Sequence, residues 1–120
     1  MTNPEKPVRT ANLITPAMLQ PHESLLVNQE RGLLAAVMGT LATAPGVLDV
    51  YDVSQDCRHP TFMSTTLSGV MGHESGFAPD GQTFWSAGAA GFTLTAVDLA
   101  NPRSPRVITT KTGVVYHGLR

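Results

Sequence analysis

The chain has 120 residues, enough for one small domain, and its formal net charge is −1. It contains no run of basic residues, so the positive surface that would neutralise nucleic-acid phosphates is missing and we expect no nucleic-acid partner. Charged residues make up 14% of the chain, against roughly 25% in typical soluble domains, so we expect most faces to be buried, within the chain or against a larger body.

Cysteine content and apolar runs exclude two further classes. Cys57 is the only cysteine, which rules out an internal disulfide and a cysteine-based zinc site, and we expect an exposed thiol in a polar turn. The longest wholly apolar run, residues 33–38, is far shorter than the roughly 20 residues of a membrane-spanning helix. We therefore expect a soluble protein without a membrane span. The first residues lack the apolar core of a signal peptide, but secretion of a longer parent protein stays open.

Short apolar runs bounded by turn residues predict strands along the whole chain. Residues 1–15 contain the first, at 8–14, which we interpret as the last strand of a preceding unit. Residues 16–68 contain four runs, at 22–28, 33–37, 47–53 and 61–66. Their β-branched and aromatic content favours strand, and no window in the chain favours a helix.

The second half of the chain follows the same plan. Residues 69–113 contain runs at 73–78, 83–88, 92–98 and 106–110. Residues 114–120 then read as the first strand of a following unit. Turn signals separate the runs, among them a Pro-Asp-Gly turn at 79–81, where Pro presets φ and Gly supplies a positive φ.

Two elements repeat in step with these strands. The sequence Asn-Pro-x-x-Pro occurs at residues 3–7 and 101–105, with a looser copy at 54–60. His-Glu-Ser occurs at 22–24 and again at 73–75, 51 residues later, and a further histidine follows 44 residues on, at 117. A period of roughly 40–50 residues built from short strands is typical of propeller blades. The predicted fold is therefore all-β: two four-stranded antiparallel propeller blades, 16–68 and 69–113, with partial blades at both ends.

The third strand of each repeat, with the turn after it, resembles the LVIVD-repeat β-propellers. In residues 46–54 a glycine precedes an apolar strand that ends in Asp-Val-Ser. In residues 91–105 a glycine precedes a strand that ends in Asp-Leu-Ala, and Asn-Pro-x-x-Pro follows, so this copy matches the family's turn better. The middle copy departs from the pattern, because Gln55 and Asp56 stand where the family has Asn-Pro. The resemblance implies a propeller but no particular activity, since many functions share that fold.

Three histidines are the best candidates for chemistry. His22, His73 and His117 each begin the first strand of a unit, and in propellers that strand lies innermost, beside the central axis. Glu23 and Glu74 follow two of them directly and are available as further ligands or as partners that fix a histidine tautomer. Imidazoles and carboxylates that converge on one point suit a divalent transition metal. The arrangement is similar in outline to that of methanethiol-oxidase-like propellers.

A structural role for the same histidines stays open. A histidine at the start of a blade can lock one blade to the next by a hydrogen bond. Successive side chains of a strand point to opposite faces, so His73 and Glu74 point the same way only at a bulge.

The remaining polar and aromatic candidates are interpreted structurally. We expect Asp52 and Asp98 to cap the turns that follow their strands. Trp85, with Phe84, is expected to pack between blade faces. His59 reads as a surface residue, and Ser75 is a poor nucleophile candidate because its flanking glycines do not form a nucleophile elbow. Asp49 has no counterpart at Leu94, which argues against a repeated role.

We thus expect a non-catalytic propeller segment that serves as a scaffold or binding module of a larger protein. Two blades leave apolar faces and strand edges uncovered, so the expected partners are the remaining blades of a parent propeller or other copies of the chain. A protein or small-molecule ligand is a further expected partner. The alternative is a metal-dependent enzyme with a His/Glu site near the axis.

Overall fold

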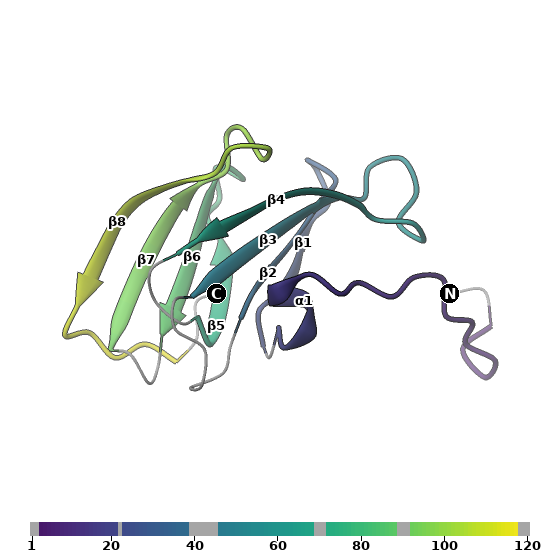
Figure 1. Ribbon diagram of the computed structural model, residues 1–120, viewed down its shortest axis with the longest axis horizontal. Helices are drawn as coiled ribbons and strands as arrows, with labels where there is room; N and C mark the ends of the chain where they lie inside the picture. Colours follow the sequence, from purple (N-terminus) through teal and green to yellow (C-terminus); the bar gives the residue numbers. More distant parts are fainter. Residues whose placement is uncertain (1–2, 22, 39–45, 69–71, 89–91, 118–120) are drawn as a thin grey trace.

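Two four-stranded antiparallel sheets make up the structure (Figure 1), and the all-β prediction is confirmed. The computed structural model describes residues 3–21, 23–38, 46–68, 72–88 and 92–117. The first sheet has the order β1 (Leu25–Asn28), β2 (Leu33–Val37), β3 (Val47–Asp52), β4 (Thr61–Leu67). The second has the order β5 (Glu74–Phe77), β6 (Thr83–Gly88), β7 (Thr93–Asp98), β8 (Arg106–Thr112). Within each sheet the strands pair in the order of the sequence, and neither sheet closes on itself within the described residues.

Tight turns set the register of the hairpins. Strands β2 and β6 have the predicted bounds, and the turn between β1 and β2 ends at Gly32, where φ is +60°. A Cβ atom at this position would lie 2.4 Å from the Cβ atom of Ser54, so only glycine fits both the conformation and the space. The carbonyl of Gly32 accepts a hydrogen bond from the Val53 amide at 2.8 Å, which ties the turn to the end of β3.

Aspartates at the ends of β3 and β7 hold the turns that follow, as predicted. The Asp52 carboxylate accepts hydrogen bonds from the Ser54 hydroxyl at 2.6 Å and from the Ser54 amide at 2.8 Å, and these bonds lower the pKa of Asp52. The Asp98 carboxylate accepts from the Ala100 amide at 2.8 Å and from the Arg106 guanidinium at 2.9 Å, and its pKa is lowered likewise. Each bond stabilises the ionised form.

The prediction that the chain has no helix is wrong. A single helical turn, α1 (Pro16–Leu19), precedes the first sheet and lies beside its lower end (Figure 1). Proline at the first helical position has no amide to satisfy and has its φ preset for the helix. Apolar periodicity cannot reveal an element of four residues, because it spans only one turn.

The expected strand at residues 8–14 is also absent. This segment is almost wholly exposed and pairs with no strand among the described residues, so its backbone groups meet no sheet edge. At the other end of the chain, Tyr116 and His117 are not in a strand, and residues 118–120 lie outside the described residues. Phe92, predicted as the start of the third strand of its repeat, instead has a φ of +52°, and β7 begins one residue later.

The core lies between the two sheets. The first sheet contributes alternate residues of β2 and β3, and the second contributes Phe84, Val97 and Leu99. Alternation along β6 places Trp85 on the opposite face from Phe84, so only Phe84 packs between the sheets as predicted. The residues of the first sheet in this layer are Leu33, Ala35, Val37, Leu48 and Val50.

Polar contacts fix how the two sheets sit on each other. The guanidinium of Arg31, in the β1–β2 turn, donates to the Gly81 carbonyl at 2.8 Å and to the Leu99 carbonyl at 2.9 Å. At the far edge of the first sheet, the Ser64 hydroxyl donates to the Pro102 carbonyl at 2.7 Å. No helix among the described residues is long and apolar enough to cross a membrane.

The first strands of the two sheets lie side by side and run in the same direction. Glu23 and Glu74 form an isolated parallel bridge, and the Ser24 hydroxyl donates to the His73 carbonyl at 2.7 Å. The Ser24 and Ser75 hydroxyl oxygens lie 3.0 Å apart, and both serines are buried. These contacts join β1 to β5 at the ends where the two strands begin.

Replacing Phe84 with alanine tests the inter-sheet core. Phe84 is fully buried, so Phe84→Ala should lower the free energy of unfolding by about 3–5 kcal/mol. Phe62 is the matched control: it is half-exposed and touches Tyr51 edge-on, so Phe62→Ala should cost about 1 kcal/mol. Urea unfolding of both variants gives the comparison, and equal losses would contradict the assigned core.

Arg31→Met tests the polar clamp between the sheets. The variant removes charged hydrogen bonds to three backbone carbonyls, those of Gly81, Leu99 and Ala100, so we expect a loss of about 1.5–3 kcal/mol. Arg58→Met is the control, because the partner of the Arg58 guanidinium among the described residues is Asp56 of its own exposed turn. Thermal melting should separate the two variants, and an Arg31→Met protein as stable as the control would refute the clamp.

Candidate functional site

The predicted histidine and glutamate side chains gather where β1 and β5 begin. Glu23 lies just before β1, and His73 lies just before β5, with its amide bonded to the Ala87 carbonyl at 2.6 Å. His117 arrives from the segment after β8, which is held by a hydrogen bond from the Val114 amide to the Phe92 carbonyl at 3.2 Å. Three stretches distant in the sequence therefore meet at one end of the two sheets.

Three of these side chains are close enough to bind one ion together. The Nε2 atoms of His73 and His117 are 3.1 Å apart, and the two rings meet edge to face. The Nε2 atom of His73 is 3.8 Å from Oε2 of Glu23, which belongs to the other sheet. One potential ligand atom of each of the three residues lies within 4.8 Å of the others. We call this set the His–Glu cluster.

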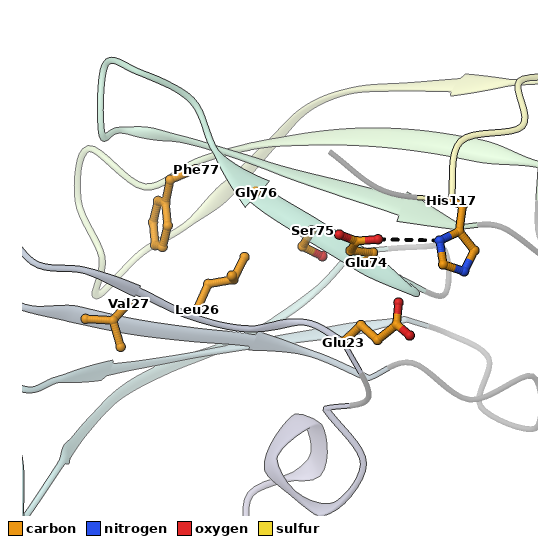
Figure 2. A pocket seen from close by; sticks show the side chains of 8 residues that line it. All are labelled: Glu23, Leu26, Val27, Glu74, Ser75, Gly76, Phe77 and His117. Carbon is orange, nitrogen blue, oxygen red and sulfur yellow. Dashed lines mark ion pairs between the residues drawn. The ribbon is translucent and has the colours of Figure 1, made fainter. Parts of the chain in front are cut away.

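Glu74 stands behind the cluster. Its Oε2 atom is 3.5 Å from Nδ1 of His117, on the opposite side of the imidazole ring from the nitrogen that meets His73 (Figure 2). The Glu74 side chain is only 14% exposed, whereas those of Glu23 and His117 are 50% and 68% exposed. Glu74 is thus placed to orient His117, while Glu23 and His117 are open to solvent on one side.

A pocket of about 680 Å³ lies beside the cluster. Figure 2 shows it between β1 and β5, with Glu23, Glu74 and His117 at one end. Its other end is lined by Leu26, Val27 and Phe77. The site therefore combines a polar end that can bind a cation or a polar group with an apolar wall that can contact a small molecule.

Four of the five predicted metal ligands come together as the repeat spacing indicated. His73, His117, Glu23 and Glu74 are all at the site, and His22 lies outside the described residues. The alternation of side chains along a strand does not prevent His73 and Glu74 from both contributing, because Glu74 contacts His117 rather than the point where His73 and His117 meet. Binding of a metal stays a prediction.

The contact between the two sheets involves serines that the sequence interpretation did not assign to this role. Ser24 bonds to the backbone of His73, and Ser75 bonds to Ser24. Ser75 is therefore a buried contact between the sheets rather than an exposed nucleophile. The signal was present in the sequence, since both serines belong to the repeated His-Glu-Ser element.

Asp49 is a functional residue of the fold that the sequence interpretation missed. It is fully buried, and its Oδ2 atom accepts a hydrogen bond from the Ala17 amide of α1 at 2.7 Å while Oδ1 accepts from the Thr65 hydroxyl at 2.6 Å. Its equivalent in β7 is Thr95 rather than Leu94, because Asp52 and Asp98 end the matching strands. The available signal was a carboxylate in an apolar strand, which needs buried partners.

The turn between β3 and β4 carries the other charged cluster. Asp56 accepts from Arg58 and lies 2.9 Å from Nδ1 of His59, and these bonds hold the pKa of Asp56 far below its usual value. His59 and Cys57 are both exposed, as predicted. The partners of this cluster all come from one turn, so it organises the loop.

No protein-family model matches the chain, and no curated protein matches it significantly.

Asp49→Asn tests the attachment of α1. The amide side chain keeps one acceptor oxygen but places an NH₂ group against a backbone amide or a hydroxyl that also donates. We expect faster hydrogen exchange at the Ala17 amide and a loss of about 1–3 kcal/mol in unfolding free energy. Asp52→Asn is the control, because Asp52 lies at an exposed turn and should leave Ala17 protected. Unchanged exchange at Ala17 in Asp49→Asn would contradict the assignment.

Proposed function

We propose that this chain is a segment of an LVIVD-type β-propeller and serves as a non-catalytic scaffold or binding module of a larger assembly. The observation that supports the proposal is the relation between the two sheets. They have the same strand order, and their first strands lie side by side in parallel, joined at Glu23 and Glu74. Neighbouring blades of a propeller have this relation, with the first strand of each nearest the axis.

The face that the second sheet turns away from the first suits a further sheet. Phe84 and Val97 pack on the first sheet, so Trp85, Leu94 and Ala96 lie on the opposite face by alternation. These three occupy the strand positions that Ala35, Leu48 and Val50 occupy in the first sheet, where those residues contact the second. A third sheet on this face would repeat the contact already present between the first two.

Exposed apolar side chains support a partner on this side of the molecule. They lie along β8 and in the segment that follows it, where they would be solvated in an isolated chain. The low share of charged residues, 14%, agrees with burial against a larger body. The exposed residues are Val107, Ile108, Val115 and Tyr116.

A metal-dependent enzyme is the second candidate function, and the His–Glu cluster beside the pocket is the observation that favours it. Three protein ligands with a free fourth position are the usual donor set of a catalytic zinc site. The scaffold proposal does not require this chemistry. Metal binding, the first step that the enzyme would need, is argued separately below.

The scaffold proposal predicts that the isolated chain associates through its uncovered face. Light scattering after size-exclusion chromatography should show a mass that rises with concentration. Trp85→Lys places a charge on that face and should lower the associated fraction several-fold, whereas Gln55→Lys, in the exposed β3–β4 turn, should not. A monomer at all concentrations that melts cooperatively would argue against the proposal.

A further inference from the structure

We propose that Glu23, His73 and His117 bind one divalent transition metal ion of the zinc type across the contact between the two sheets. Glu74 acts as a positioning residue for His117. The inference goes beyond the scaffold role and does not depend on a complete ring, because all four residues belong to this chain and already lie together.

The distances fit a single ion. Zinc binds imidazole nitrogen and carboxylate oxygen at about 2.0–2.2 Å, so two ligands of a tetrahedral site lie about 3.3–3.5 Å apart. The His73–His117 nitrogen distance is 3.1 Å and the His73–Glu23 distance is 3.8 Å, on either side of that value. For the two pairs with His73, shifts of a few tenths of an ångström suffice. Glu23 and His117 lie within 4.8 Å of each other, so this pair has to close by up to about 1.3 Å, and both side chains are exposed enough to move.

The donor set selects the metal. Two imidazole nitrogens and one carboxylate oxygen suit zinc and its first-row neighbours, whereas calcium and magnesium prefer oxygen ligands alone. A thiolate from this chain is not part of the site, because Cys57 belongs to the β3–β4 turn. We therefore expect zinc to bind and magnesium to fail to compete with it.

Glu74 fixes which nitrogen of His117 faces the metal. A carboxylate at Nδ1 favours the tautomer that carries its proton there, and this leaves a lone pair on Nε2 for the ion. The Glu74 Oε2 atom is 3.5 Å from Nδ1, and Nε2 is the atom that meets His73. The mostly buried Glu74 thus supplies the carboxylate that faces the nitrogen of His117 not bound to the metal, an arrangement typical of zinc-bound histidines.

The same contact between the histidines also exists without a metal. One protonated Nε2 can donate to the other across 3.1 Å, which would be a hydrogen bond between the segments that precede β5 and follow β8 in the second sheet. A metal ion replaces that proton and draws in Glu23 as a third ligand. Experiments can separate the two states because only one of them contains Glu23 and a stoichiometric ion.

Three protein ligands leave a fourth coordination position open. The pocket is lined by Glu23 and His117, two of the three ligands, and by the apolar wall of Leu26, Val27 and Phe77. Water or a small molecule with a donor atom and a short apolar part fits such a position. The proposed site is thus an open one rather than a closed structural site.

Zinc titration of the full chain tests the proposal. The protein is purified without a histidine tag, dialysed against zinc chloride and assayed for bound metal, and we expect one zinc per chain. His73→Ala, His117→Ala and Glu23→Ala should each weaken binding at least about 10-fold, while magnesium in excess should not displace the zinc. His59→Ala is the matched control, because His59 lies in the β3–β4 turn, and it should bind as the parent does.

A double-mutant comparison tests the role of Glu74. Glu74→Gln should weaken zinc binding about 10–100-fold, the usual effect of losing an outer-shell carboxylate. In a His117→Ala background the same change should have no further effect on zinc affinity, because the role proposed for Glu74 in zinc binding is to orient His117. A merely structural Glu74 would lower melting temperature in both backgrounds and leave the zinc affinity alone.

Cobalt substitution reads the coordination directly. Cobalt bound at the site should give the intense visible absorption bands of a four-coordinate ion, and these should be lost in His117→Ala. Residue 117 lies outside the strands, so this change should leave the sheets intact. Absence of stoichiometric zinc in the parent, or equal zinc binding by His73→Ala, His117→Ala and His59→Ala, would overturn the proposal. Because the zinc stoichiometry is counted per chain, it does not depend on association. A protein that binds zinc but stays monomeric would therefore contradict the scaffold proposal and leave the metal site supported.

Discussion

The contact between β1 and β5 is the constraint on which the rest of the structure depends. The Ser24 hydroxyl donates its one hydrogen to the His73 carbonyl, so in the contact between the two serines the Ser75 hydroxyl is the donor and Ser24 the acceptor. This buried chain of hydrogen bonds fixes the starting ends of the two strands relative to each other. The bridge between Glu23 and Glu74 then places Glu23 next to His73, and His117 completes the cluster from the segment after β8.

Burial and polar contacts contribute differently to this arrangement. The apolar layer around Phe84 supplies the free energy of association between the sheets, but apolar packing alone would tolerate small slips. The directional bonds from Ser24, Arg31 and Ser64 to backbone carbonyls of the second sheet remove that freedom. The precision of the site therefore comes from polar groups that contribute little area, and its stability comes from the core.

Strand patterns and local turn chemistry made the all-β architecture predictable from sequence. The bounds of β2 and β6 and the turn roles of Asp52 and Asp98 follow from period-two patterns and local turn chemistry. The meeting of the histidine and glutamate side chains followed from their equal places in the repeats. Asp49 and α1 could not be predicted, because a buried carboxylate and a four-residue helix stabilise each other through a contact 32 residues apart. The prediction of a strand at residues 8–14 was wrong, because an apolar run in the sequence does not show whether a neighbouring strand is available to pair with it.

Disulfide trapping between the two sheets tests this account most directly. The Ser24 and Ser75 hydroxyl oxygens are 3.0 Å apart, so sulfur atoms in their places are within a small rotation of the roughly 2.05 Å disulfide bond length. Ser24→Cys with Ser75→Cys, in a Cys57→Ser background, should oxidise readily under native conditions and give a cross-linked species by mass spectrometry of proteolytic peptides. Two thiols that stay free in the oxidised, folded protein would contradict the side-by-side placement of β1 and β5.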